Sequence, residues 1–177
     1  MNKIWLGWLL FASWVLCTSW LLYQSGNQHY GEFDPQRQLQ QQQQQLPALN
    51  RLAAKASSNS SSSAVLLHVL DPDCPCSSKA KEHIKQLQTE LQDKKLQQIV
   101  ISVHELEQSG ISVPATPLVI YLENKQLVYS GPYASGPACS TENSMLTAVL
   151  QQKTQVQGSW LNSETWSCRC LNDTTTM

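Results

Sequence analysis

Two cysteines, Cys74 and Cys76, stand at a point of the chain where a thiol can become reactive. Residues 64–70 form an apolar run that predicts a buried strand, and residues 80–91 repeat apolar side chains at helical spacing. The cysteines therefore lie where a strand ends and a helix begins. Unpaired backbone N–H groups and the helix dipole stabilise a thiolate there and lower its pKa from about 8.5. We expect a redox-active pair at this turn.

The elements that must position this turn follow in a simple order. Residues 98–104 are rich in β-branched side chains and predict a second strand, which the intervening helix should place parallel to the first. Residues 118–122 and 126–130 predict a hairpin. A last amphipathic helix is expected from 143 to about 152. The predicted order is β-α-β-β-β-α, an α/β fold.

Thr116 and Pro117 directly precede the first strand of this hairpin. This dipeptide resembles the cis-proline element of the thioredoxin superfamily. The resemblance implies a thioredoxin-like fold in which Pro117 lies across from Cys74 and Thr116 presents its backbone to an incoming disulfide. The alternative is an ordinary trans proline opening an edge strand. Together with the cysteine turn, the dipeptide favours a cis bond.

Further segments are similar to an uncharacterised family of bacterial membrane-anchored thioredoxin-like proteins. They are the glycine-rich stretch 131–136, Cys139, Asn143-Ser144, Phe33-Asp34-Pro35 and Cys168-Arg169-Cys170. The resemblance implies the same fold and a position on the periplasmic side of the membrane. It supplies no substrate.

The cysteine turn departs from thioredoxins, which have Trp-Cys-Gly-Pro-Cys where this chain has Asp-Cys-Pro-Cys-Ser. If Cys74 is the nucleophile, Ser77 stands at the resolving position and Cys76 comes one residue early. A disulfide between Cys74 and Cys76 would close a small, strained ring and be readily reduced. The motif therefore favours an oxidase, an isomerase or a thiol-capture role over a strongly reducing enzyme.

Of the six cysteines, Cys17 lies in an apolar N-terminal segment and the other five lie beyond it. An odd number leaves a thiol that is unpaired, metal-bound or joined to another chain. One scheme joins Cys139 to Cys168 or Cys170 as a structural staple. Another makes Cys168 or Cys170 a resolving thiol for Cys74. The sequence does not choose between these connectivities.

A metal site is the main alternative to redox chemistry. Cys74 and Cys76, with further cysteines, could bind Cu(I) or Zn²⁺ through thiolates. The chain has four histidines, His29, His68, His83 and His104. Each is more often an ordinary surface or core residue than a metal ligand. We expect no cofactor. The net charge of −1 gives no sign of nucleic-acid binding.

The N-terminus predicts a membrane anchor. Residues 4–23 carry no charge and are long enough to cross a bilayer, with Lys3 before them and residues 1–3 expected in the cytoplasm. A cleaved signal peptide is the competing interpretation.

Residues 24–63 are rich in glutamine and serine, which predicts a disordered linker. Two exceptions are expected within it: a helix at residues 46–56, and docking of residues 31–35 on the domain.

The sequence thus predicts one thioredoxin-like domain, residues 64–177, with a cysteine-containing tail and a single-pass anchor in an inner membrane. Its expected function is thiol–disulfide exchange on exported proteins or a membrane redox partner. Cys74 would attack, Cys76 or a C-terminal cysteine would resolve, and Thr116 with Pro117 would shape the groove. The alternatives are metal binding or delivery, and a non-catalytic scaffold on the same fold.

Overall fold

Five strands form a mixed sheet at the centre of the domain. In a computed structural model, residues 3–27, 29–56, 63–91, 96–151 and 158–172 are described. The strand order is β3-β2-β5-β6-β7. These strands are β2 (Ala64–Leu70), β3 (Leu96–Ser102), β5 (Leu118–Glu123), β6 (Gln126–Gly131) and β7 (Trp160–Leu161). The chain is a mixed α/β protein, as predicted.

The first βαβ unit has the predicted parallel pairing. Strand β2 pairs in parallel with β3, and helix α3 (Pro75–Glu90) connects them. On its other side β2 pairs antiparallel with β5, so it lies inside the sheet and is apolar on both faces. Leu67 and Val69 join one core cluster, whereas Leu66 and Leu70 join the other.

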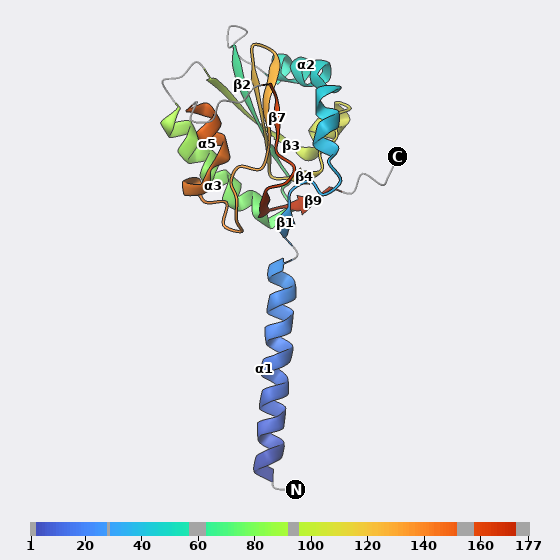
Figure 1. Cartoon of the computed structure of the whole chain (residues 1–177), viewed down its shortest axis with the longest axis vertical. Coiled ribbons are helices and arrows are strands. Elements are labelled where there is room, and N and C mark those ends of the chain that lie inside the picture. Colours follow the sequence, from blue (N-terminus) through green and yellow to red (C-terminus); the bar gives the residue numbers. More distant parts are fainter. Residues whose placement is uncertain (1–2, 28, 57–62, 92–95, 152–157, 173–177) are drawn as a thin grey trace.

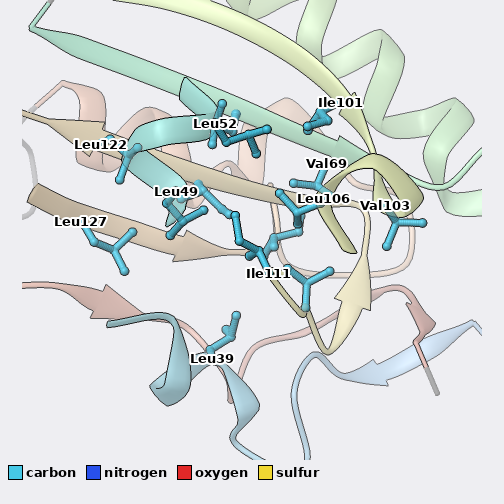
Figure 2. Packing of buried hydrophobic residues seen from close by; sticks show 14 of the residues in the cluster. Leu39, Leu49, Leu52, Val69, Ile101, Val103, Leu106, Ile111, Leu122 and Leu127 are labelled. Atoms are coloured by element: carbon cyan, nitrogen blue, oxygen red, sulfur yellow. The ribbon is translucent and has the colours of Figure 1, made fainter. Parts of the chain in front are cut away.

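Helices cover both faces of the sheet (Figure 1). Helix α3 and the short helix α5 (Met145–Leu150) pack on one face, where their side chains join the cluster containing Leu66. The 3-10 helix η1 (Gln38–Gln43), helix α2 (Leu46–Ala56) and helix α4 (Val103–Gln108) contribute to the cluster on the other face. Figure 2 shows Leu49 and Leu52 among side chains of the sheet, and Leu39 belongs to the same cluster. The domain is therefore a three-layer arrangement.

The prediction of a disordered linker over 24–63 is wrong for residues 29–56, which fold onto the domain. Phe33, Leu39 and Leu49 are fully buried in the core cluster of that face. Asp34 is also buried, and its carboxylate accepts hydrogen bonds from the backbone N–H groups of Gln38 and Leu39. A few apolar side chains among the glutamines are sufficient because the sheet offers an apolar face to cover. The expected helix at 46–56 and the docking of 31–35 are confirmed. Residues 57–62 of the serine tract lie outside the described residues.

Two predicted boundaries shift. The second strand covers 96–102 rather than 98–104, because Ser102 caps helix α4 by accepting a hydrogen bond from the N–H of Glu105 at 3.2 Å. His104 therefore lies on a helix. The last helix is likewise capped by Ser144 and begins at Met145, after the 3-10 turn Thr141–Asn143. Its predicted end at 152 lies outside the described residues.

Two small antiparallel ribbons complete the fold at the carboxyl end of β2. Strand β1 (Tyr30–Glu32) pairs with β8 (Trp166–Cys168), and β4 (Ala115–Thr116) pairs with β9 (Cys170–Leu171). The expected tail is thus a set of short strands. Both ribbons bring residues more than fifty positions apart together, beside the start of α3 (Figure 1).

Helix α1 (Lys3–Asn27) precedes the domain, and its segment Ile4–Gln24 is long and apolar enough to cross a membrane by length and composition. Within the described part of the chain, no second helix meets that description. Figure 1 shows α1 leading directly into the end of the domain that holds β1 and β9.

Candidate functional site

Cys74 occupies the N-cap of helix α3, the position at which we expected a reactive thiol. Its φ and ψ of −84° and 121° are extended, and its carbonyl accepts the first helical hydrogen bond from Ser77 N at 3.0 Å. Pro75 follows at the first helical position, where its missing N–H leaves no donor unsatisfied. Upstream, the Asp71 carboxylate accepts a hydrogen bond from Asp73 N at 2.9 Å. The helix dipole therefore points its positive end at Cys74.

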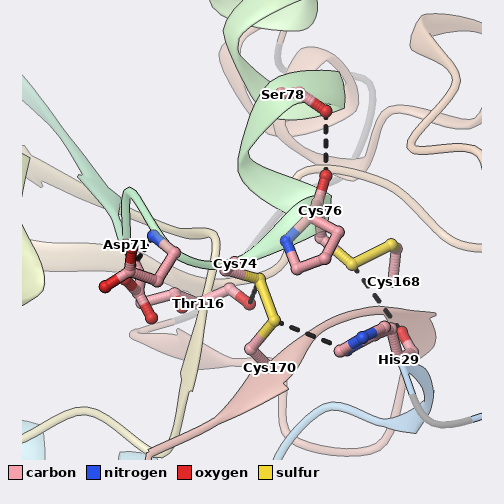
Figure 3. Close-up of a disulfide and its surroundings, with 10 residues drawn as sticks. His29, Asp71, Cys74, Cys76, Ser78, Thr116, Cys168 and Cys170 are labelled. Carbon is pink, nitrogen blue, oxygen red and sulfur yellow. Dashed lines mark hydrogen bonds between the residues drawn. A yellow bond between two sulfur atoms is a disulfide. The ribbon is translucent and has the colours of Figure 1, made fainter.

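The structure joins the turn to the C-terminal segment through two disulfides, Cys74–Cys170 and Cys76–Cys168 (Figure 3). Cys74 and Cys76 are therefore not bonded to each other, and the argument for an oxidising small ring falls away. Of the two schemes for the tail, the one that pairs a C-terminal cysteine with Cys74 matches the structure. Cys139 is a free, buried thiol, so the staple from Cys139 to the tail is wrong. The two ribbons determine the disulfide pairing, because they place Cys168 and Cys170 beside the start of α3.

The peptide bond between Thr116 and Pro117 is cis, as predicted. Thr116 lies opposite Cys170 in the β4–β9 pair, and the Cys74 sulfur lies 3.7 Å from the Thr116 carbonyl oxygen. Beyond them, Asn172 donates its backbone N–H to Pro114 O at 2.9 Å and its side-chain amide to Val113 O at 3.1 Å. Besides the two disulfides, backbone hydrogen bonds thus hold the tail beside Cys74 as an added strand.

Sequence reasoning missed His29 as part of this site. Its Nδ1 lies 3.6 Å from the sulfur of Cys170, and its carbonyl oxygen lies 3.8 Å from the sulfur of Cys76 (Figure 3). The same carbonyl accepts a hydrogen bond from Arg169 N at 2.7 Å. The sequence places His29 in the predicted linker, and the docking expected for residues 31–35 is the one sequence signal close to it. A protonated imidazole there would stabilise a thiolate on Cys170.

Three of these sulfurs also form the geometry of a metal cluster. The Sγ atoms of Cys74, Cys76 and Cys170 all lie within 4.8 Å of one another. Two of these sulfurs are bonded to each other and the third belongs to the second disulfide, so the grouping follows from the disulfides. Once reduced, these cysteines would offer thiolates, the ligand type that suits soft or borderline ions such as Cu(I) and Zn²⁺. Metal binding needs the thiolates, and disulfide formation consumes them by oxidation, so the two states exclude each other.

A buried polar network lies behind the site. His68 Nδ1 lies 2.8 Å from the hydroxyl of Tyr133, and its Nε2 lies 3.1 Å from the side-chain oxygen of Gln98. Burial lowers the pKa of His68 to about 4 and also lowers the pKa of His83, which lies 3.1 Å from Ser144 Oγ. Burial raises the pKa of Tyr133 well above its ordinary value. His68 and His83 are therefore core residues, and His104 is exposed on α4.

Cys139 lines a pocket of about 450 Å³ beside α3, together with Lys79 and His83. Burial raises the pKa of the Cys139 thiol, although the nearby Lys79 ammonium acts in the opposite direction. A thiol in this state is a poor nucleophile at neutral pH. Cys139 packs in the same buried cluster as the disulfide-bonded cysteines.

The comparisons with known proteins give a family and no activity. No curated protein matches the chain, and no solved structure matches it. Residues 36–172 match one family, described as "Domain of unknown function (DUF6436)". That match covers most of the chain, including the η1 and α2 segment and both C-terminal cysteines. The chain belongs to the DUF6436 family.

Proposed function

We propose that this chain is a membrane-anchored thiol–disulfide exchange protein with a thioredoxin-like fold, its domain on the periplasmic side of an inner membrane. The observation that carries the proposal is the contact set of Cys74. This cysteine caps a helix, lies 3.7 Å from the carbonyl that precedes a cis proline, and is bonded to Cys170. A helix N-terminus lowers the pKa of a thiol and so favours exchange. A purely structural disulfide would require neither the helix N-terminus nor the cis proline.

The reaction we propose starts from the reduced protein. The Cys74 thiolate attacks one sulfur of a substrate disulfide, forms a mixed disulfide, and releases the other substrate sulfur as a thiolate, which takes up a proton. The Cys170 thiolate then attacks Cys74, forms the Cys74–Cys170 bond, and releases the remaining substrate thiolate. Two electrons pass from the protein dithiol to the substrate. The Cys74–Cys170 disulfide present in the structure is the bond that this step would form.

The reaction is reversible, and the partner's reduction potential sets its direction. In the opposite direction a substrate dithiol is oxidised and the protein disulfide is reduced. In the disulfide state Cys74 is only 4% exposed, since β9 covers it. A substrate strand that pairs with Ala115 and Thr116 would take the place of β9. Suitable substrates are therefore extended polypeptide segments that carry cysteine.

The test is single-turnover exchange between the reduced full-length protein in detergent and a peptide that contains one disulfide. Alkylation and mass spectrometry follow the thiols of Cys74 and Cys170. Cys74→Ser should abolish substrate reduction, while Cys139→Ser, the matched control, should keep it. When reduced, the two variants should unfold at similar urea concentrations, since each replaces one buried sulfur by a hydroxyl. Unchanged substrate reduction by Cys74→Ser would overturn the assignment.

Metal binding is a second candidate, favoured by the clustering of Cys74, Cys76 and Cys170 within 4.8 Å. It requires the reduced state. Titration of the reduced protein with Zn²⁺ would then show one tightly bound ion per chain, lost when Cys74 and Cys76 are both changed to serine. If reduced wild-type protein binds no more Zn²⁺ than that double variant, the metal candidate is eliminated.

A further inference from the structure

The disulfide site is linked to the membrane-spanning segment by a very short stretch of chain. The apolar segment of α1 ends at Gln24, and His29 already contacts both disulfides. At most about 3.6 Å per residue, the five steps from Gln24 to His29 span no more than about 18 Å. Whatever angle α1 takes, the two disulfides lie close to the end of this helix.

The ribbon that follows His29 fixes this closeness through the backbone. Tyr30 lies opposite Cys168 in the β1–β8 pair, and Arg169 N donates to His29 O. The segment that leaves α1 is therefore hydrogen-bonded to the segment that bears Cys168 and Cys170. Figure 1 shows β1 and β9 at the end of the domain nearest α1.

Exposed apolar side chains gather on the same ribbons. Apart from α1, the large apolar side chains that are exposed in the described part of the chain are Val100, Trp166 and Leu171. Two of these three lie on β8 and β9. Trp166 is 58% exposed and packs edge-on against Tyr30, with ring centroids 5.8 Å apart. Trp and Tyr are the side chains that favour the boundary between lipid and water.

We propose that the Tyr30–Trp166 pair on the β1–β8 ribbon, called here the aromatic face, rests in the lipid headgroup region of the bilayer that α1 spans. The disulfides would then exchange at the membrane surface, with a membrane protein whose thiols lie at that depth. The bilayer contact does not depend on exchange activity. The choice of a membrane protein as redox partner rests on the proposed function.

The test uses the full-length chain in phospholipid vesicles that contain a phosphatidylethanolamine with a pyridyl disulfide on its headgroup. A protein thiolate attacks this disulfide, forms a lipid–protein disulfide, and releases pyridine-2-thione. The chain carries Gln126→Cys as an internal reference, and Cys74, Cys76 and Cys168 are changed to serine so that no neighbouring thiol removes the lipid from Cys170. Position 126 lies at the other end of the sheet from the disulfides. It is next to Glu123, which pairs with Ala64 at the start of β2, whereas Leu70 at the end of β2 leads to Cys74. The length of β2 separates these two ends by about 20 Å.

The protein is first reduced. The extent to which the lipid reagent labels each thiol is then divided by the extent to which soluble dipyridyl disulfide labels it, so that the ratio corrects for the intrinsic reactivity of the thiol. We expect this ratio to be about tenfold higher for Cys170 than for the thiol at position 126, because a membrane-bound reagent has a high effective concentration only near the bilayer. Trp166→Ser should lower the Cys170 ratio about threefold, since it removes an interfacial anchor. Val100→Ser removes an equally exposed apolar side chain from β3 and should leave the ratio unchanged.

Three results would overturn the inference. The first is an equal ratio at Cys170 and position 126, and the second is an equal effect of Trp166→Ser and Val100→Ser on the Cys170 ratio. The third is release of the chain from vesicles by alkaline carbonate, which would show that α1 does not anchor it. A chain that passes this labelling test but reduces no peptide disulfide would keep the aromatic face at the bilayer and lose only the exchange function.

Discussion

Cys170 lies directly opposite Thr116 in the antiparallel pair of β4 and β9, and this register brings its sulfur within bonding distance of the sulfur of Cys74. The strand bearing Cys170 thus occupies the backbone edge beside the cis proline. Cys168, two residues earlier, is bonded to Cys76. The two disulfides connect the same two segments, so each holds the other's cysteines close. Breaking one leaves its thiols near each other, at a high effective concentration.

The tail cysteines should differ in their roles. With Cys170→Ser we expect the reduced protein to attack a peptide disulfide but to accumulate the mixed disulfide on Cys74, because the resolving thiol is missing. Cys168→Ser should still complete the reaction. Mass spectrometry of acid-quenched, alkylated samples measures the trapped species. If Cys170→Ser traps no mixed disulfide while exchange continues, Cys76 is the resolving thiol.

His29 should assist exchange electrostatically. Its Nδ1 lies 3.6 Å from the sulfur of Cys170, and opposite charges about 4 Å apart attract by about 1 kcal/mol in water. Losing that attraction corresponds to about a fivefold slower rate. His29→Gln should therefore slow formation of the Cys74–Cys170 bond, by about fivefold where the full attraction is lost. His104→Gln, on exposed α4, is the control. Equal rates in the two variants would exclude a role for the imidazole.

The N-terminal segment should contribute strongly to stability. Leu49 on α2 is fully buried in the cluster shared with the sheet. Leu49→Ala should lower the free energy of unfolding by about 2–5 kcal/mol, since it leaves a cavity in a packed core. Arg51→Ala on the same helix removes an exposed side chain and should change it by less than about 0.5 kcal/mol. Urea denaturation measures both. Similar values would mean that this segment is not part of the core.

His68 should make stability depend on pH. Its pKa in the folded protein is about 4, because burial disfavours the charged ring, against 6.5 for an unperturbed histidine. Between pH 6.5 and 4 the unfolded chain binds a proton that the folded protein does not. This group therefore removes stability as the pH falls through that window, by at most about 3 kcal/mol. His68→Gln should show a smaller loss of stability between pH 7 and pH 5 in urea denaturation. A loss identical to that of His104→Gln would contradict the assignment.

Much of the fold could be predicted because its signals are local. The apolar runs that become α1, β2 and β5 are legible in the sequence, as is the hairpin turn, where Asn124 and Lys125 take the positive φ values that tight hairpins need. The position of Cys74 at a helix start and the proline element at 116–117 are likewise short-range features. Sequence alone therefore determined the order of the main elements and the location of the candidate site.

Only the tertiary structure decided which cysteines meet. Cys74 pairs with Cys170 across 96 residues, through strands of two and three residues that are too short to show a pattern. The same limit hid the packing of residues 29–56, since Phe33, Leu39 and Leu49 are isolated among polar neighbours and are buried only because the sheet presents an apolar face. Connectivity and burial depend on contacts between distant segments. No local periodicity encodes them.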